Sequence, residues 1–330
     1  SAMSQCFDEL QDSAAVELTS SSVSGGGRTL VAKKNLEEDE LVLQSNLLAA
    51  CALEGHTANL CGACYKISAT PLQLRCPRCK QVYFCNAACQ NNVDGDHAMS
   101  CLALRKWKGG SKLDSQKVSL LRLLLQVYVA CFKFVPAGKK VNATKALAKF
   151  RCLHFHEEAW DVSERNVWQK PFAFFLQAWR SAKVPWTPSI KDLCADIGRI
   201  ECNVFSLYED ASGALVGHAV YPSAGIALNH SCAPNCYADD KGVKVLKFFA
   251  THNGRGVASA RAVSAGEELC ISYVDVKMPV GSRRRALKEQ YHFECKCAKC
   301  EDDIKWDFRK SLLRSRLHPL AFTCLKGSSI

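Results

Sequence analysis

The chain has 330 residues, of which 48% are apolar and 23% charged, and its formal net charge is +11 at pH 7. This length and composition are typical of a soluble globular protein with a large core. The Lys and Arg residues are spread over the whole sequence, so the positive charge admits an acidic or nucleic-acid partner but gives little support for a defined nucleic-acid interface.

The chain contains twenty cysteines, a number that would suit a disulfide scaffold in a short secreted protein. This chain is long, however, and its first residues, SAMSQCFDELQD, lack the apolar core of a secretory signal. We therefore expect reduced thiols and a reducing compartment, the nucleus or the cytoplasm. The opening SAM resembles a cloning remnant, so a native targeting sequence could have been removed.

No membrane span is expected. The longest apolar stretch, 118–134, is interrupted by Arg122, Gln126 and Lys133, which a bilayer would accommodate only at a cost of roughly several kcal/mol. This stretch is therefore predicted to be a buried helix.

The N-terminal half is predicted to pass from strands to helices. Residues 20–27, SSSVSGGG, read as a flexible lead-in, and 28–48 as two short strands around a turn at 37–40. Helical periodicity follows at 115–134, 143–160 and 167–181, with Pro171 near the start of the last helix. The aromatic residues at helical spacing are predicted to be core: Trp160, Trp168, Phe172, Phe175 and Trp179.

The C-terminal half is predicted to be mainly strands. Five segments show strand patterns, with turns at 211–213 and 264–266: 203–210, 214–222, 242–250, 255–263 and 268–275. A basic helix is expected at 281–291 and a short one within 307–320. The expected fold class is α+β, with strands that reassemble across the inserted cysteine-rich and helical segments.

Residues 61–101 have the ligand spacing of two zinc sites. The order is CGAC, eleven residues, CPRC, five residues, Cys85 and Cys89, seven residues, then His97 and Cys101. Four ligand pairs predict two tetrahedral ions. Domains of this kind usually interleave their pairs, with Cys61, Cys64, Cys85 and Cys89 on one ion and Cys76, Cys79, His97 and Cys101 on the other. The order resembles a MYND finger, which implies a module that binds proline-rich peptides.

A third zinc site is predicted near the C-terminus. Cys295, Cys297 and Cys300 offer three thiols but no fourth ligand nearby in sequence. Cys232 is the expected fourth ligand, and Cys236 is the alternative. Other cysteines in apolar surroundings are expected to be small hydrophobic residues, among them Cys131, Cys152, Cys194 and Cys270.

Three motifs together resemble a SET domain with its post-SET zinc: LNHSC, GEELCISYVD and YHFECKCAKC. With the finger, the chain resembles the SET-and-MYND (SMYD) protein-lysine methyltransferases. The resemblance implies small SET sheets with a pseudoknot and the following divisions: N-terminal SET strands 1–60, MYND finger 61–101, helical insertion 102–200, core SET 201–275, post-SET zinc segment 276–302 and a tail 303–330.

The resemblance also implies residue roles. The family transfers a methyl group from S-adenosylmethionine to lysine side chains of histones or other proteins, which implies a chromatin regulator. Tyr273 corresponds to the tyrosine beside the transferring methyl group, and Tyr221 and Tyr291 would line the lysine channel. The residues expected to bind the cofactor are Gly26, Gly27, Arg28, Glu201, Asn203, Asn229, His230, Tyr273 and Phe293.

Two departures from the family leave an alternative open. Thr29 replaces the second glycine of a Gly-x-Gly turn, where glycine would let the backbone approach the cofactor. Many relatives also continue into a long helical domain that covers the substrate groove, whereas this sequence ends about thirty residues after Cys300, so a more open groove is expected. The alternative is a zinc-stabilised adaptor without turnover. Either protein is expected to be monomeric.

Overall fold

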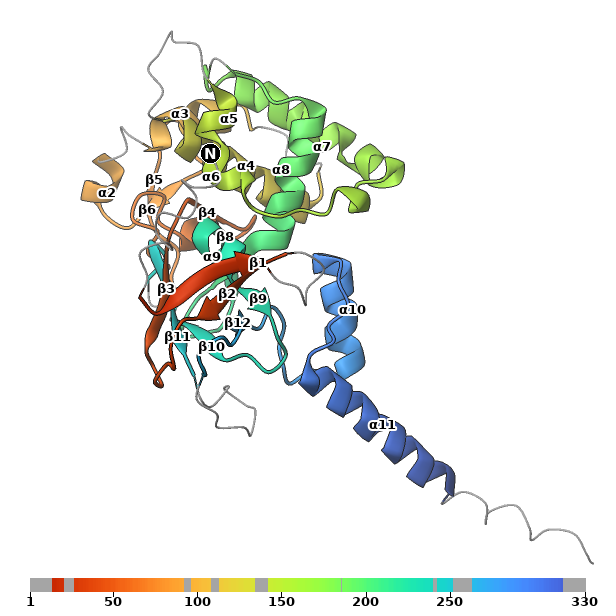
Figure 1. Ribbon diagram of the computed structural model, residues 1–330. Coiled ribbons are helices and arrows are strands. Elements are labelled where there is room, and N and C mark those ends of the chain that lie inside the picture. Colours follow the sequence, from red (N-terminus) through yellow and green to blue (C-terminus); the bar gives the residue numbers. More distant parts are fainter. Residues whose placement is uncertain are drawn as a thin grey trace, which may run out of the picture.

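The structure is a computed structural model in which strands and helices gather in separate regions. In Figure 1 helices α3 to α8 lie in the upper half, most of the small sheets lie below them, and α10 leads into α11, which projects away from the body. The described residues are 14–20, 27–91, 96–107, 113–133, 142–184, 186–239, 242–251 and 263–316.

The described strands form five small sheets rather than one large one. Most pairings are antiparallel, and β9 with β12 is the parallel exception. The sheets are β1 (Val16–Ser20) with β2 (Arg28–Ala32); β10 (Cys236–Asp239), β11 (Val245–Ala250) and β3 (Leu41–Asn46); β12 (Cys270–Ile271) with β9 (Asn229–His230); β4 (Ala49–Ala52), β8 (Leu215–Val220) and β7 (Val204–Tyr208); and β5 (Leu74–Arg75) with β6 (Tyr83–Phe84).

The described helices fall into three groups along the chain. The first group is η1 (Thr57–Asn59), directly before the finger, with α2 (Ala87–Asn91) and α3 (Asp96–Leu104) in the finger and at its end. The insertion contains α4 (Ser115–Phe132), α5 (Ala143–Ala146), α6 (Ala148–Arg151), η4 (Glu157–Ala159), α7 (Val162–Arg180) and α8 (Ile190–Asn203). The remainder are α9 (Pro222–Ala227), α10 (Val280–Tyr291) and α11 (Ala298–Arg316).

One apolar core joins the finger to the helical insertion. It contains the buried finger residues Cys61 and Phe84 together with α4 and the aromatic residues of α7. Arg122 of α4 is 3% exposed and donates from Nη2 to the backbone oxygen of Gln81 at 3.1 Å. The finger is therefore packed against the body and shares its core. A second core fills the space between the strands of the small sheets, and a small third one surrounds the cysteines near the C-terminus.

The predicted helices are partly corrected by the structure. The buried helix at 115–134 is confirmed as α4, and the aromatic core is confirmed because all five residues are at most 5% exposed. A continuous helix over 143–160 is wrong: α5, α6 and η4 replace it, and Leu147 and Cys152 cap separate turns. The third helix begins earlier, at Val162, because the side chain of Asp161 accepts from the N–H of Glu164. Pro171 consequently lies inside α7 rather than near its start.

The C-terminal helices also differ from expectation. The helix at 281–291 is confirmed as α10. The next helix is longer than predicted, because α11 begins at Ala298, inside the third cysteine cluster. Helices α8 and α9 were not predicted, although Ser189 and Asp192 form a capping box that marks the start of α8.

The predicted strands are mostly present, but their partners are distant in sequence. Strands β2 and β3 flank the predicted turn, yet they do not pair, since β2 pairs with β1 and β3 with β11. Ser20 belongs to β1 rather than to a flexible lead-in, and residues 21–26 lie outside the described part. The strand predicted at 268–275 is reduced to β12. The strand predicted at 255–263 falls almost entirely outside the described residues.

Most of the described cysteines have free thiols, as predicted, including Cys131, Cys194 and Cys270. Cys152 is the correction: it is disulfide-bonded, although it packs, half-buried, against the first apolar core as predicted. Among the described residues, no helix combines the length and apolarity that crossing a membrane requires.

Candidate functional site

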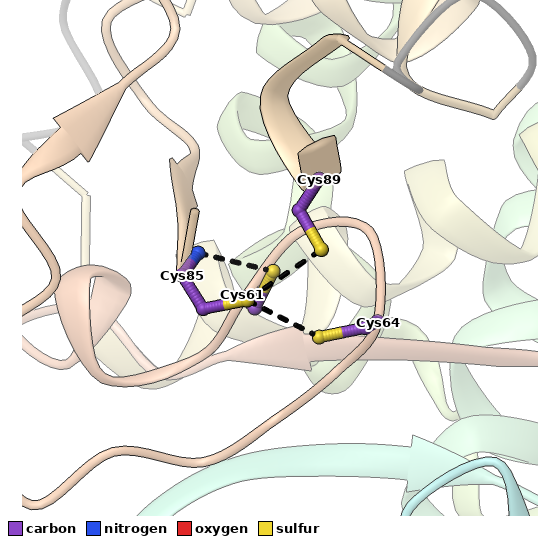
Figure 2. A group of neighbouring side chains, drawn as sticks. All are labelled: Cys61, Cys64, Cys85 and Cys89. Atoms are coloured by element: carbon purple, nitrogen blue, oxygen red, sulfur yellow. Dashed lines mark hydrogen bonds between the residues drawn. The ribbon is translucent and has the colours of Figure 1, made fainter. Parts of the chain in front are cut away.

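The first predicted metal site is assembled from two turns of the finger. Figure 2 shows the four thiols of Cys61, Cys64, Cys85 and Cys89 pointing toward one another. The sulfur of Cys85 lies 3.6 Å from that of Cys64 and 3.5 Å from that of Cys89. Tetrahedral zinc with Zn–S bonds of about 2.3 Å separates its sulfurs by about 3.8 Å. The spacing therefore fits a zinc ion.

Backbone donors favour the thiolate form of Cys61. Burial opposes ionisation of Cys61, but N–H groups of Cys64, Ala63 and Cys85 outweigh it and lower the pKa of the thiol to about 7. Gly62 lets the Cys61–Cys64 turn pack closely on the Val82 side chain, because a Cβ at Gly62 would lie 2.1 Å from Cγ1 of Val82. The tight turn at Gly62 and the lowered pKa of Cys61 are both consistent with a metal-binding thiolate.

The second site places Cys76, Cys79, His97 and Cys101 together. The sulfurs of Cys76 and Cys101 are 3.8 Å apart, and Nε2 of His97 lies 3.5 Å from the sulfur of Cys79. Burial lowers the pKa of His97 to about 4, which keeps the imidazole in its neutral, ligating form. Ser100 donates to the His97 carbonyl at 3.1 Å, so its oxygen can accept from Nδ1 at 3.2 Å and orient the ring.

The third site joins residues that are far apart in sequence. Cys232 lies 3.5 Å from Cys300 and 4.0 Å from Cys295, sulfur to sulfur, and Cys297 completes the group. The alternative fourth ligand, Cys236, is buried in β10 and does not belong to this group. The structure thus brings together the three ligand sets that the spacing predicts, and each could hold zinc.

Arg283 is a buried cation beside the third cysteine group. Its side chain is 2% exposed; Nε donates to the sulfur of Cys232 at 3.3 Å and Nη2 to that of Cys300 at 3.6 Å. Nη2 also donates to Asp303 at 2.8 Å, and Nη1 to the carbonyl of Met278 at 2.6 Å. Four thiolates on one Zn²⁺ would leave two excess negative charges, so a buried guanidinium here offsets part of them.

Strands β9 and β12 place the sequence NH beside the end of the second SET motif. Asn229 pairs with Cys270 and His230 with Ile271 in parallel register. Nδ1 of His230 accepts from the backbone N–H of Tyr273 at 2.9 Å. Burial lowers the pKa of His230 to about 4, so the neutral ring carries its proton on Nε2, which faces the sulfur of Cys232 at 3.2 Å. His230 therefore couples the strand pair to the third metal site.

Asn229, Thr29 and Glu268 form one polar group. Nδ2 of Asn229 donates to the carbonyl of Arg28 and to Oε1 of Glu268, each at 2.9 Å. The hydroxyl of Thr29, which is 5% exposed, donates to the same carboxylate oxygen at 2.5 Å. Thr29 thus fixes the first SET strand to Glu268 where the family pattern has glycine. The Oδ1 atom of Asn229 has no partner among the described residues.

Aromatic side chains surround the end of this strand pair. The ring of Tyr273 lies 4.8 Å from that of Tyr291 and 5.3 Å from that of His230, between ring centroids. Phe293 lies 6.0 Å from His230. Two predicted site residues, Tyr273 and Phe293, therefore contact one imidazole, and a third, Tyr291, packs on Tyr273.

Tyr273 is held in one orientation. Its hydroxyl donates to the carbonyl of Leu228 at 2.6 Å, and burial, with a smaller effect of Tyr291, raises the pKa of the phenol. Burial also raises the pKa of Tyr291 to about 12. Both phenols are neutral at physiological pH, so they can position a reactant but do not act as ionised bases.

The side chains of the other predicted site residues make their described contacts outside this aromatic group. Tyr221 is enclosed in the second core, where its hydroxyl donates to Val243 at 2.5 Å, and no described ring contact joins it to Tyr273. Asn203 donates to the carbonyls of His154 and Arg199, both at 2.8 Å. Glu201 is half-buried in α8. The side chain of Arg28 donates from Nη2 to the carbonyl of Cys152 at 2.7 Å.

Of the predicted glycines, Gly27 is exposed and Gly26 lies outside the described residues. Two polar residues at the site were missed by sequence reasoning, Glu268 and Arg283. Glu268 lies within the GEELC motif at the start of the predicted strand, so its position could have identified it as a site residue. Arg283 is one of three successive arginines, and nothing in that run distinguishes the buried one.

Comparisons with known proteins give a consistent family assignment. The SET domain family model matches residues 27–274. Histone-lysine N-methyltransferase Smyd1 of Mus musculus is 26% identical over 86% of this chain and 55% of its own length. Histone-lysine N-methyltransferase SMYD3 of Homo sapiens is 28% identical, covering 84% of this chain and 60% of that protein. N-lysine methyltransferase SMYD2-A of Danio rerio is 27% identical, covering 87% and 62%.

The chain thus spans little more than half the length of these relatives. Among solved structures, Rubisco LSMT bound to AdoMet aligns with a TM-score of 0.42 at 15% identity, over 90% of this chain and 57% of that one.

Proposed function

Because the chain belongs to the SET-domain family, we propose that it is an S-adenosylmethionine-dependent protein-lysine N-methyltransferase acting on histones or other proteins. The observation that carries the proposal is the aromatic group in which Tyr273 and Phe293 both contact His230 and Tyr291 contacts Tyr273, beside the polar group of Asn229. The names of the relatives, which are histone-lysine and N-lysine methyltransferases, support it.

The residues present fit the methyl donor. The acceptor oxygen of Asn229, which has no partner among the described residues, suits an ammonium group such as that of the donor's amino-acid end. The faces of Phe293, Tyr273 and Tyr291 suit a sulfonium cation. When bound, S-adenosylmethionine supplies an electrophilic methyl group. These side chains would orient it and exclude water.

The target lysine must lose a proton before it attacks, because a charged ammonium has no lone pair. An aromatic, water-poor channel disfavours the charged amine and so lowers its pKa. Tyr273 keeps its own proton, since burial raises the pKa of its phenol, and its hydroxyl is fixed on the carbonyl of Leu228. We therefore assign Tyr273 a positioning role beside the reacting nitrogen, and assign deprotonation to desolvation.

The test is methyl incorporation from labelled S-adenosylmethionine into a mixed pool of histones and lysate proteins, with Tyr273→Phe as the variant. We expect labelling by the parent and a loss on the order of 10² in the variant. Tyr83→Phe is the matched control, because Tyr83 lies in β6 of the finger and its ring makes no described contact with the site residues. Mass mapping of the labelled residues identifies the modified lysines.

The adaptor remains the second candidate, and Thr29 is the observation that favours it, because a buried threonine occupies the glycine position. No labelling by the parent, with Tyr273→Phe indistinguishable from it, would support the adaptor. We propose that the finger, in either case, recruits proline-rich peptides, and that the three cysteine-rich groups each hold one zinc ion. Calorimetric titration with proline-rich peptides and elemental analysis test these two statements.

We further propose a monomer in the nucleus or cytoplasm. Light scattering of the purified chain and imaging of a tagged full-length protein check these statements. A nucleic-acid role predicts binding that weakens steeply with salt, because Lys and Arg contacts release counterions. A weak response to salt would remove that role.

A further inference from the structure

Three histidines outside the zinc groups meet on the surface. His154 and His156 precede η4, and His292 ends α10. The ring of His156 lies 4.8 Å from that of His154 and 5.0 Å from that of His292, between centroids. The two segments are more than a hundred residues apart in sequence, so this contact is made by the fold.

We propose that His154, His156 and His292 form a surface binding site for a divalent transition-metal ion of the Ni²⁺, Cu²⁺ or Zn²⁺ type. Imidazole nitrogens are good ligands for these ions. Metal–nitrogen bonds of about 2.0 Å in tetrahedral geometry place imidazole centroids about 5.2 Å apart, and octahedral geometry about 4.5 Å apart. The separations of His156 from each of its two neighbours lie between these values.

Glu158 determines which ring nitrogen of His156, the central ligand, carries the proton. Its Oε1 lies 2.8 Å from Nδ1 of His156. Backbone hydrogen bonding and His156 lower the pKa of Glu158, so the carboxylate only accepts, and Nδ1 must carry the proton. The lone pair of His156 is then on Nε2. A carboxylate on the far nitrogen is the usual outer partner of a metal-bound histidine.

The flanking rings are available as ligands. Both His154 and His292 are exposed, and their ring nitrogens have no hydrogen-bond partner among the described residues. Partial desolvation lowers the pKa of His154, assisted by His156, Arg28 and Arg199, while Glu158 opposes this effect. Burial and His156 likewise lower the pKa of His292. Both imidazoles therefore favour the neutral, ligating form.

Metal binding would require small side-chain rotations. Among the described residues, the groups whose ligand atoms all lie within 4.8 Å of one another are the three cysteine-rich ones, so the histidine nitrogens do not yet converge. The exposed rings of His154 and His292 can change rotamer on the nanosecond scale around the half-buried His156, and three ligands leave further positions for water.

The three histidines adjoin two residues that are predicted to bind the cofactor, Asn203 and Phe293. The carbonyl of His154 accepts from Asn203, and His292 directly precedes Phe293, so both segments adjoin predicted cofactor residues. A bound ion would join the helical insertion to the end of α10 and restrain both. This inference concerns a surface site and does not depend on methyl transfer.

The experiment titrates Ni²⁺ into the full-length protein that retains its native zinc, by calorimetry at pH 7.5, with absorption spectra recorded in parallel. We expect one Ni²⁺ beyond the resident metal, no thiolate charge-transfer band, and affinity at least tenfold weaker in both His156→Ala and His292→Asn. Asn is chosen because His292 has φ of 58°, a left-handed conformation that Asn tolerates.

His56→Ala is the matched control, since it removes one imidazole elsewhere and should leave the affinity unchanged. Hydrogen exchange of 152–158 and 288–293 should slow together when Ni²⁺ is added to the parent. The proposal is overturned if the folded parent binds no Ni²⁺, if both cluster variants bind it like the parent, or if binding produces a thiolate band.

Discussion

Replacing Arg283 by Met tests whether a buried cation stabilises the third metal site. Met approximates the length and apolar volume of the arginine stem but carries no charge. The change removes two N–H contacts to sulfur, at 3.3 and 3.6 Å, and the ion pair with Asp303 at 2.8 Å. It also leaves the carbonyl of Met278 without its 2.6 Å donor.

The expected magnitude follows from these contacts. Loss of an outer partner of metal ligands typically weakens metal affinity about 10- to 100-fold, which is roughly 1.4–2.7 kcal/mol. The unpaired carbonyl of Met278 adds about 1–3 kcal/mol. Asp303 is 33% exposed and can be rehydrated, so its loss of a partner costs little. We expect Arg283→Met to lower the free energy of unfolding by about 3–5 kcal/mol.

The assay combines zinc release to a chromogenic chelator with thermal unfolding. One of the three expected ions should leave the variant at chelator concentrations that do not affect the parent, and the melting temperature should fall. Arg285→Met is the control, because Arg285 is exposed on the same helix and makes no described contact with the cysteines. Parent-like retention of all three ions in a folded Arg283→Met protein would refute the reasoning.

Three further predictions follow from single contacts. Cys232→Ser should lose one zinc ion by elemental analysis while Cys236→Ser keeps all of them, because only Cys232 joins the third group; equal losses would contradict this assignment. Gly62→Ala should destabilise the finger by about 1–3 kcal/mol in thermal melts, since its Cβ would lie 2.1 Å from Val82, whereas Gly281→Ala, with open space around it, should not; similar melts for both would count against this packing. Burial raises the pKa of Glu201 to about 7, with a smaller effect of Glu164, so the folded protein retains a proton that the unfolded chain releases above about pH 4.5. Stability should therefore fall as pH rises toward 7, and Glu201→Gln should recover up to about 3 kcal/mol at pH 8, but not at pH 4, in urea unfolding; an equal effect at both pH values would show that the carboxylate is not the cause.

The ligand groups of the finger were predictable because they are local. Pairs such as Cys61 and Cys64, two residues apart in a turn, can reach one ion whatever the rest of the chain does. The interleaving of the pairs came from knowledge of similar domains, and the structure agrees with it. Spacing alone leaves Cys232 and Cys236 as alternatives for the fourth ligand of the third site, and the structure places Cys236 in a strand of the second core.

Partners across long distances were not predictable from pattern. Arg283 lies among three arginines, and only the packing of α10 against the cysteines decides which one is buried. The alternation in 28–48 indicated strands but not that β2 would pair with β1. Helical periodicity over 143–160 was misleading, since Leu147 and Phe150 are buried by short turns and not by one continuous helix.

The pairing of β3 with β11 has a consequence for synthesis in the cell. Val245 of β11 pairs with Asn46 of β3, so the first strand leaves the ribosome roughly two hundred residues before its partner exists. At translation rates of about 5–20 residues per second, this interval is about 10–40 s. During it the edge of β3 has no native neighbour, so the nascent chain is expected to depend on chaperones until β11 emerges.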